Sequence, residues 1–152
     1  MKRSVVRSFL CTWLACLIFS AASRADELIM VRAERPFADA IGDLQIAIQD
    51  HGYQVARIQR VDVGLVSGGY TTAEYRLVFF GKPEEMRELE ESHPELLPYL
   101  PLKIVIFAEG DSTLALAYNP AILQTFFKTD VPQTQIRRWE KDMRSILDQF
   151  AH

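Results

Sequence analysis

Between residues 28 and 150, the pattern of hydrophobic and polar residues changes repeatedly. Short apolar or alternating runs predict strands, and apolar residues three and four positions apart predict helices. Short apolar runs typical of strands occupy residues 28–31, 53–63, 75–80, 102–108 and 113–118. Apolar residues spaced three and four positions apart predict amphipathic helices that begin at Pro36, Pro83, Pro120 and about Gln133. Each proline suits a first helical turn, because the backbone N–H that it lacks has no partner there.

The helix predicted from Gln133 to Phe150 has the strongest pattern. Its apolar side chains form one continuous stripe: Ile136, Trp139, Met143, Ile146, Leu147 and Phe150. Among the strands, residues 102–108 are the most strand-like and are expected at the centre of the sheet. Residues 28–31 and 75–80 are apolar on both faces, so other strands beside them and a covering layer are expected.

Local signals predict how these elements end. Gly52 is expected to end the first helix in a left-handed cap. The alternation breaks near Arg57, which indicates a bulge in the second strand. Residues 64–72 are expected to form a loop, and residues 109–112 a hairpin turn. In the short helix after Pro120, four side chains are expected to face the core: Ile122, Leu123, Phe126 and Phe127.

The predicted order is β-α-β-β-α-β-β-α. Few of the connections are long enough for repeated parallel crossovers, so the sheet should be mostly antiparallel with helices on one face. The fold class expected for residues 26–152 is therefore a single α+β domain, a two-layer sandwich. A chain of 152 residues leaves room for little more than one domain.

The first 25 residues have the composition of a secretory signal peptide. A basic start containing Lys2 and Arg3 precedes the apolar run 9–19, and small residues follow up to Ala25. Cleavage is predicted after Ala25, with Ala22 as a second position, so the protein is expected to be periplasmic or secreted. A retained N-terminal anchor is the alternative, although the apolar run is short of the about 20 residues that a membrane span needs.

Both cysteines, Cys11 and Cys16, lie inside this segment. Acylation of Cys16 is a further alternative, but Trp13 fits a lipoprotein signal poorly. If the segment is removed, the domain has no cysteine, which excludes disulfides, thiolate catalysis and cysteine-ligated metals.

Removal of the segment also makes the chain more acidic. It would leave 13 Lys and Arg, four fewer than the 17 of the whole chain, against 20 Asp and Glu, so the net charge changes from −3 to −7. An acidic surface repels phosphate backbones and anionic lipids. Neither nucleic acid nor a membrane surface is therefore expected as a partner.

Few residues suggest chemistry. His93 lies beside Glu90, Glu91 and Glu95, where an acid–base pair is conceivable, but no spacing typical of a zinc site is present. No metal or cofactor is therefore expected. Tyr99, Tyr118 and Asn119 fall at the ends of the central elements, where a small sheet often leaves a cleft, so these residues and His93 are the candidate ligand-binding set. The structural alternative is that Tyr118 packs in the core and Asn119 caps a helix.

Several short motifs occur in a familiar order. They are Gly52-Tyr53, Phe80-Gly81-Lys82-Pro83, Leu100-Pro101-Leu102-Lys103 and Tyr118-Asn119-Pro120. In this order and spacing, residues 28–150 resemble the "domain of unknown function 302" family. The resemblance implies a two-layer sandwich with a topology like that of the TATA-binding protein, without implying DNA binding. Many relatives carry cysteines at these landmarks, whereas this chain has Gly81, Lys82 and Leu102, so the resemblance implies no thiol chemistry here.

Two hypotheses for function follow from the sequence. The first is a non-enzymatic exported module that binds a small molecule or an exported protein, with a homodimer as one possible form. The second is a hydrolase or isomerase with an acid–base site near His93.

Overall fold

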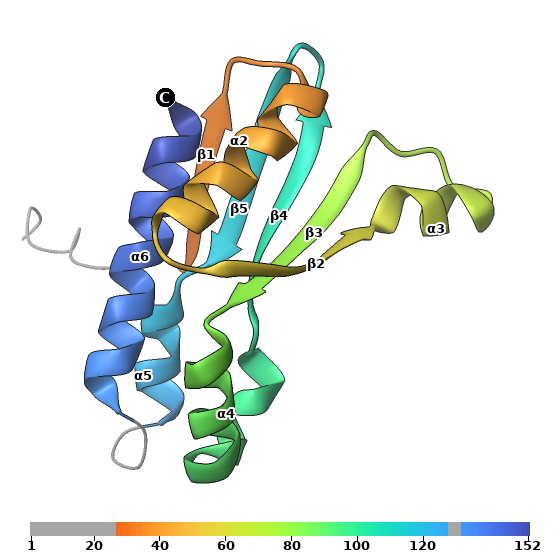
Figure 1. The fold of residues 1–152 in the computed structure, drawn as a ribbon. Coiled ribbons are helices and arrows are strands. Elements are labelled where there is room, and N and C mark those ends of the chain that lie inside the picture. The colour runs from red at the N-terminus through yellow and green to blue at the C-terminus, as the bar shows by residue number, and fades with distance from the viewer. Residues whose placement is uncertain (1–26, 128–131) are drawn as a thin grey trace, which may run out of the picture.

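The computed structural model describes residues 27–127 and 132–152, so the predicted signal peptide and its cleavage site at Ala25 lie outside the described residues. Five strands form one sheet in the order β1-β5-β4-β3-β2, and all neighbouring pairs are antiparallel (Figure 1). The strands are β1 (Leu28–Ala33), β2 (Gln54–Arg60), β3 (Tyr75–Gly81), β4 (Leu102–Glu109) and β5 (Ser112–Tyr118). The most strand-like run, β4, is central, as predicted.

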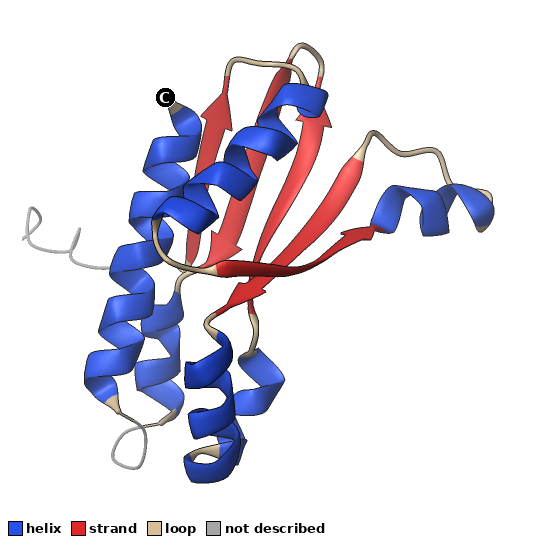
Figure 2. Cartoon of the chain, viewed as in Figure 1, coloured by secondary structure: helices blue, strands red, loops and turns tan. Residues whose placement is uncertain are grey.

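Two helices, α2 (Phe37–Asp50) and α6 (Gln133–Ala151), cover one face of the sheet (Figure 2). The predicted stripe of α6 is confirmed, because the helix buries all six of its members: Ile136, Trp139, Met143, Ile146, Leu147 and Phe150. These side chains meet the inward residues Val78 and Phe80 of β3 and Ile104 and Ile106 of β4 in one hydrophobic core. The α+β two-layer prediction is therefore correct.

The remaining helices lie at the periphery. Four short ones gather at one end of the sheet: α4 (Pro83–Ser92), the 3₁₀ helices η1 (Pro94–Tyr99) and η2 (Pro120–Ile122), and α5 (Leu123–Phe126). A fifth, α3 (Val61–Ser67), projects away from the body between β2 and β3 (Figure 1). Gly52, with φ of 74°, ends α2 as predicted, and a register shift between Val55 and Arg57 confirms the predicted bulge.

Three local predictions are corrected by the structure. The second strand ends at Arg60, and Val61–Ser67 form a helix where strand and then loop were predicted. The strand β1 lies at the edge of the sheet with β5 as its one neighbouring strand. Phe126 is 62% exposed, because the single turn of α5 presents Leu123 to the core and leaves Phe126 outside.

Candidate functional site

The second face of the sheet has no helix packed over it among the described residues (Figure 2). Side chains alternate between the two faces of a strand. In β3, Arg76, Val78 and Phe80 are therefore buried under the helices, while Tyr75 and the other residues of its phase are half-exposed on the opposite side. This uncovered side, called here the open face, is built from every second residue of the strands.

The open face is apolar along rows that cross the sheet. The strand registers place Met30, Leu116, Val105 and Leu77 side by side in a middle row on four strands. Rows on either side add more apolar side chains. The apolar residues of the open face are Leu28, Met30, Tyr75, Leu77, Phe79, Val105, Phe107, Leu114, Leu116 and Tyr118.

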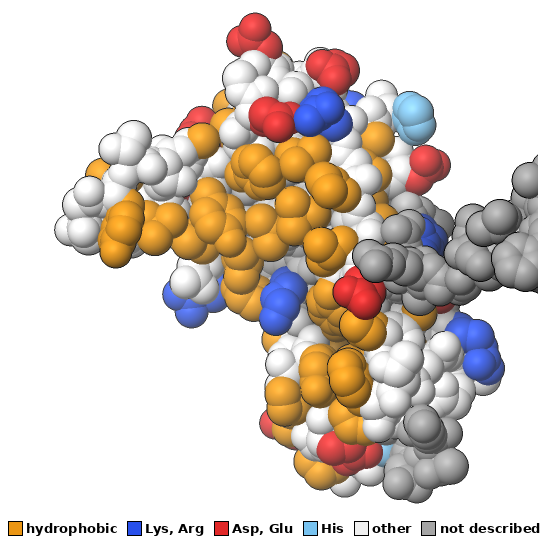
Figure 3. Space-filling view, turned by 180° about the vertical axis from the view of Figure 1, so that it is seen from behind, with side chains coloured by type: hydrophobic (Ala, Val, Ile, Leu, Met, Phe, Trp, Pro, Cys, Tyr) orange, Lys and Arg blue, Asp and Glu red, His pale blue; other side chains and the backbone are white. Residues whose placement is uncertain are grey.

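Figure 3 shows this surface as a broad, nearly continuous hydrophobic area that extends onto the projecting segment. A hollow of about 360 Å³ opens within it, lined by Thr72, Ala73, Tyr75, Val105, Phe107 and Leu116. Contiguous exposed apolar patches beyond a few hundred Å² are rare on monomeric soluble proteins and usually mark interaction sites. The open face is therefore the candidate functional site.

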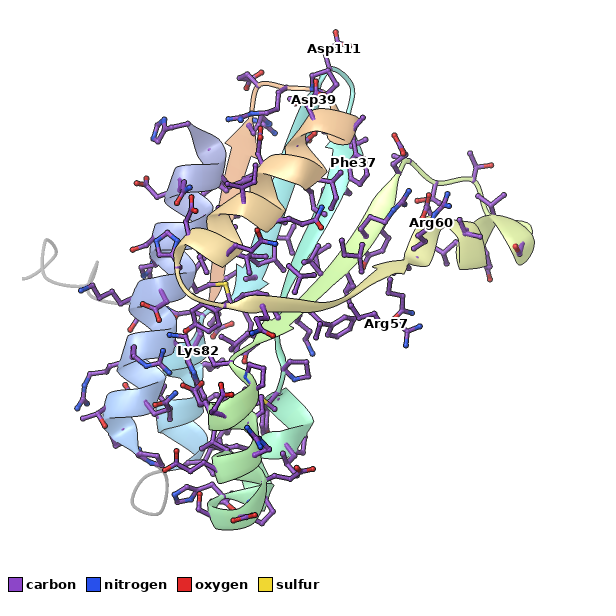
Figure 4. All side chains as sticks on the ribbon, in the orientation of Figure 1. Phe37, Asp39, Arg57, Arg60, Lys82 and Asp111 are labelled. Atoms are coloured by element: carbon purple, nitrogen blue, oxygen red, sulfur yellow. The ribbon has the colours of Figure 1, made fainter. Side chains whose placement is uncertain are left out.

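The charged residues of the open face stand at its margins. Lys103 and Arg57 flank Phe79 in an outer row, and Arg57 is exposed on the edge strand β2 (Figure 4). At the opposite end, Arg32 of β1 forms an ion pair with Glu109 of β4. The middle row contains no charged residue across β1, β5, β4 and β3.

Three of the four candidate residues from the sequence lie close together. The hydroxyl of Tyr118 donates to the backbone carbonyl of Tyr99 at 3.2 Å, and burial raises the pKa of Tyr118 to about 12. The ring of Tyr99 packs edge-on against Phe127, with centroids 5.8 Å apart. Tyr118 thus belongs to one end of the open face and Tyr99 supports it.

Asn119, next to Tyr118, has a structural role. It is 3% exposed, and its Oδ1 accepts a hydrogen bond from the backbone N–H of Ala121 at 2.9 Å, which caps η2. Its Nδ2 donates to Glu140 of α6 at 3.3 Å. Both ends of the amide are therefore occupied by contacts within the chain.

His93 lies apart from the other candidates, where α4 meets η1. Its Nδ1 is 3.2 Å from Oε1 of Glu95, and the side chain is 25% exposed. His93 does not line the hollow of the open face. It is also absent from a second hollow between β1 and α6 and from a third beside Gly81. This placement does not favour the acid–base hypothesis.

A polar cluster that the sequence analysis missed joins α4 to α6. Glu85 accepts a hydrogen bond from the indole N–H of Trp139 at 2.8 Å and pairs with Arg138. The hydroxyl of Tyr53 donates to Asp142 at 2.7 Å, and burial raises the pKa of Tyr53. The spacing of Arg138 and Asp142, four residues apart on one helix, is the signal that could have indicated part of the cluster. Its opposite charges pair with one another, which indicates that the cluster holds α4 against α6 and has a structural role.

Among the described residues, no group of three or more His, Cys, Asp or Glu side chains is arranged to hold a metal ion. Within the same residues, no helix has the length and hydropathy needed to cross a membrane.

Comparison with known proteins places the chain in a family. The model of the family "Domain of unknown function DUF302" matches residues 29–150, so the chain belongs to this family. Among solved structures, the chain is similar to the crystal structure of an uncharacterized conserved DUF302 protein from Bacillus stearothermophilus. The TM-score is 0.73 at 18% identity, and the match covers 82% of this chain and 98% of that one. At this identity the likeness shows the fold. No curated protein matches.

Proposed function

We propose that this domain is a non-enzymatic binding module and that the open face of its sheet is the binding surface. The observation that carries the proposal is the uncharged middle row of Met30, Leu116, Val105 and Leu77, which spans four strands without a covering layer from the described chain. The module is expected to act as an exported protein after its N-terminal segment has been removed.

The composition of the strands supports this proposal. Strands that are apolar on both faces are typical of sheets covered on both sides. In β3 and β4, one set of alternate residues packs under α2 and α6, and the other set, also largely apolar, lies on the open face. A polar second phase would suffice for a sheet that stays in contact with water. The apolar one therefore indicates that a partner covers this face.

The extent of the face favours a protein over a small molecule as the partner. The hollow of about 360 Å³ is near the lower end of the range for small-ligand sites, about 300–1,000 Å³. Exposed Leu28 and Met30 on β1 lie outside the residues that line it. A surface that continues beyond this hollow across the sheet is better matched by a partner of protein size.

The proposal can be tested with the purified protein and the uncharged apolar fluorescent probe Nile red. Leu116→Lys places a charge at the centre of the middle row, whereas Ile46→Lys changes a residue that is 54% exposed on α2, away from the sheet's open face. At high protein dilution we expect the probe to bind wild type and Ile46→Lys equally and Leu116→Lys several-fold more weakly. Equal binding to all three proteins, or none to wild type, would refute the open face as a binding surface.

A further inference from the structure

The segment that projects from the sheet has apolar side chains and covers nothing within the described chain. This arm, residues 61–74, comprises α3 and the loop to β3 (Figure 1). Helix α3 has no buried residue. Along the arm, Val63, Val66 and Tyr70 are 45%, 58% and 68% exposed. Residues 27–127 and 132–152 of one copy therefore give these exposed apolar side chains no packing partner in the core.

The base of the arm is nevertheless held firmly. Asp62 in the first turn of α3 forms an ion pair with Arg76 of β3, and the two side chains are only 13% and 10% exposed. The guanidinium of Arg76 also lies 5.3 Å from the centre of the Phe37 ring of α2. Burying a charge is costly unless it is paired, so this pair ties the arm to the inside of the sheet at a defined position.

The open face and the arm together offer an area of the order that a stable dimer needs. Five strands about 4.8 Å apart and about 20 Å long give a plan area of about 500 Å². A stable interface of standard size buries about 800 Å² on each partner. The relief of the side chains makes the accessible area of the face larger than this plan area, and the arm, into which the hydrophobic surface continues, adds to it (Figure 3). The face and the arm together are therefore of the size that a stable dimer needs.

We propose that the partner is a second copy of this chain, stacked open face to open face about a two-fold axis, with the arm of each copy inside the interface. This inference rests on the proposed function of the open face and names its partner. In a two-fold pair, the same patch on both copies must be complementary to itself. A flat, uncharged middle row meets that condition, since equal apolar surfaces can face each other without opposing charges.

The charged residues agree with this arrangement. Lys103 and Arg57 stand in an outer row, so their long side chains can reach water at the rim of the contact. If the partner were instead an acidic protein or an anionic amphiphile, these two cations would be central to recognition. Lys103→Glu therefore separates the two cases.

Sedimentation velocity over a range of protein concentrations tests the inference. We expect wild type, Ile46→Lys and Lys103→Glu to form dimers, Leu116→Lys to be monomeric, and Val66→Asp to dimerise at least about tenfold more weakly. Circular dichroism checks that each variant is folded. Met30→Lys, in the same row and 58% exposed in the monomer, replaces Leu116→Lys should the latter fail to fold.

Each outcome has a defined meaning. A monomeric wild type at every concentration would overturn the inference, as would a dimer unaffected by Leu116→Lys and Met30→Lys. If Val66→Asp dimerises as strongly as wild type, the arm lies outside the interface. If Lys103→Glu no longer dimerises, Lys103 does not lie at the rim of the contact. If wild type is monomeric but the probe still distinguishes Leu116→Lys, the dimer fails and the binding function stands. If the probe does not distinguish that variant either, both fail.

Discussion

Arg76 and Asp62 form an ion pair that links the inner face of the sheet to the base of the arm. Arg76 comes from β3, between residues that pack on the open face, and its own side chain points the other way, toward Phe37 of α2. One strand thus contributes to the core, to the anchor of the arm and to the apolar surface. The position of the arm relative to the open face depends on this pair.

Breaking the pair should free the arm before it unfolds the domain. In Asp62→Asn, the carboxylate that pairs with the guanidinium of Arg76 is lost, and a buried charge is left with a weaker partner. We expect hydrogen exchange of residues 61–74 to quicken several-fold while α6 stays protected. Asp39→Asn is the matched control, since Asp39 also lies in a first helical turn but is exposed on α2. Equal exchange in the two variants would show that the pair does not hold the arm.

Two glycine substitutions should change stability in opposite directions. Gly52 has φ of 74°, and a Cβ there would meet only Lys82 Nζ at 3.8 Å, so Gly52→Ala should cost about 1–2 kcal/mol through backbone strain. Gly42 lies inside α2 with open space around a Cβ, so Gly42→Ala should stabilise by about 0.5–1 kcal/mol. Urea unfolding of both variants measures the difference, and the same sign for both would contradict the conformations described.

Asn119 should contribute to stability and leave binding unchanged. Asn119→Ala removes the acceptor for the N–H of Ala121 and the donor to Glu140, so we expect a loss of about 1–2 kcal/mol in the free energy of unfolding. Asn119→Asp keeps the acceptor and should retain part of that stability at low pH. If the Asn119→Ala protein is folded but binds the probe more weakly, Asn119 contributes to binding, as the sequence predicted.

The buried hydroxyl of Tyr118 should make the domain sensitive to alkali. Burial raises its pKa from an ordinary value of 10.0 to about 12, so the folded protein retains this proton longer than the unfolded chain. The resulting stability is fully present below pH 10 and is lost as the pH rises through about 12. Ultraviolet titration should show one late-ionising tyrosine fewer in Tyr118→Phe. Loss of a tyrosine that ionises near the ordinary pKa of 10.0 would instead place the Tyr118 hydroxyl in water.

The sequence predicted well those elements whose pattern is local. The apolar residues from Ile136 to Phe150 recur at helical spacing, which predicts a helix that packs on the sheet through one face. Gly52 and the break near Arg57 are equally local, and the structure confirms both. The antiparallel topology followed from the lengths of the connections.

The arm could not be predicted in the same way. Val61 and Val63 favour a strand by propensity, and the helix that they form instead is anchored by Arg76, fourteen residues beyond Asp62. The sequence did indicate the open face, because residues 75–80 and 102–108 are apolar on both sides of the strands that they predict. Its meaning required the structure, which shows that the helices of the described chain cover one side only.

Carbene footprinting of the wild-type protein, once dilute and once concentrated, tests most directly whether the open face is an interface between copies. We expect labelling of Tyr75, Leu77 and Leu116 to fall as the concentration rises, while labelling of Ile46 on α2 stays constant. Equal labelling of the open face at both concentrations, or an equal fall at Ile46, would contradict it.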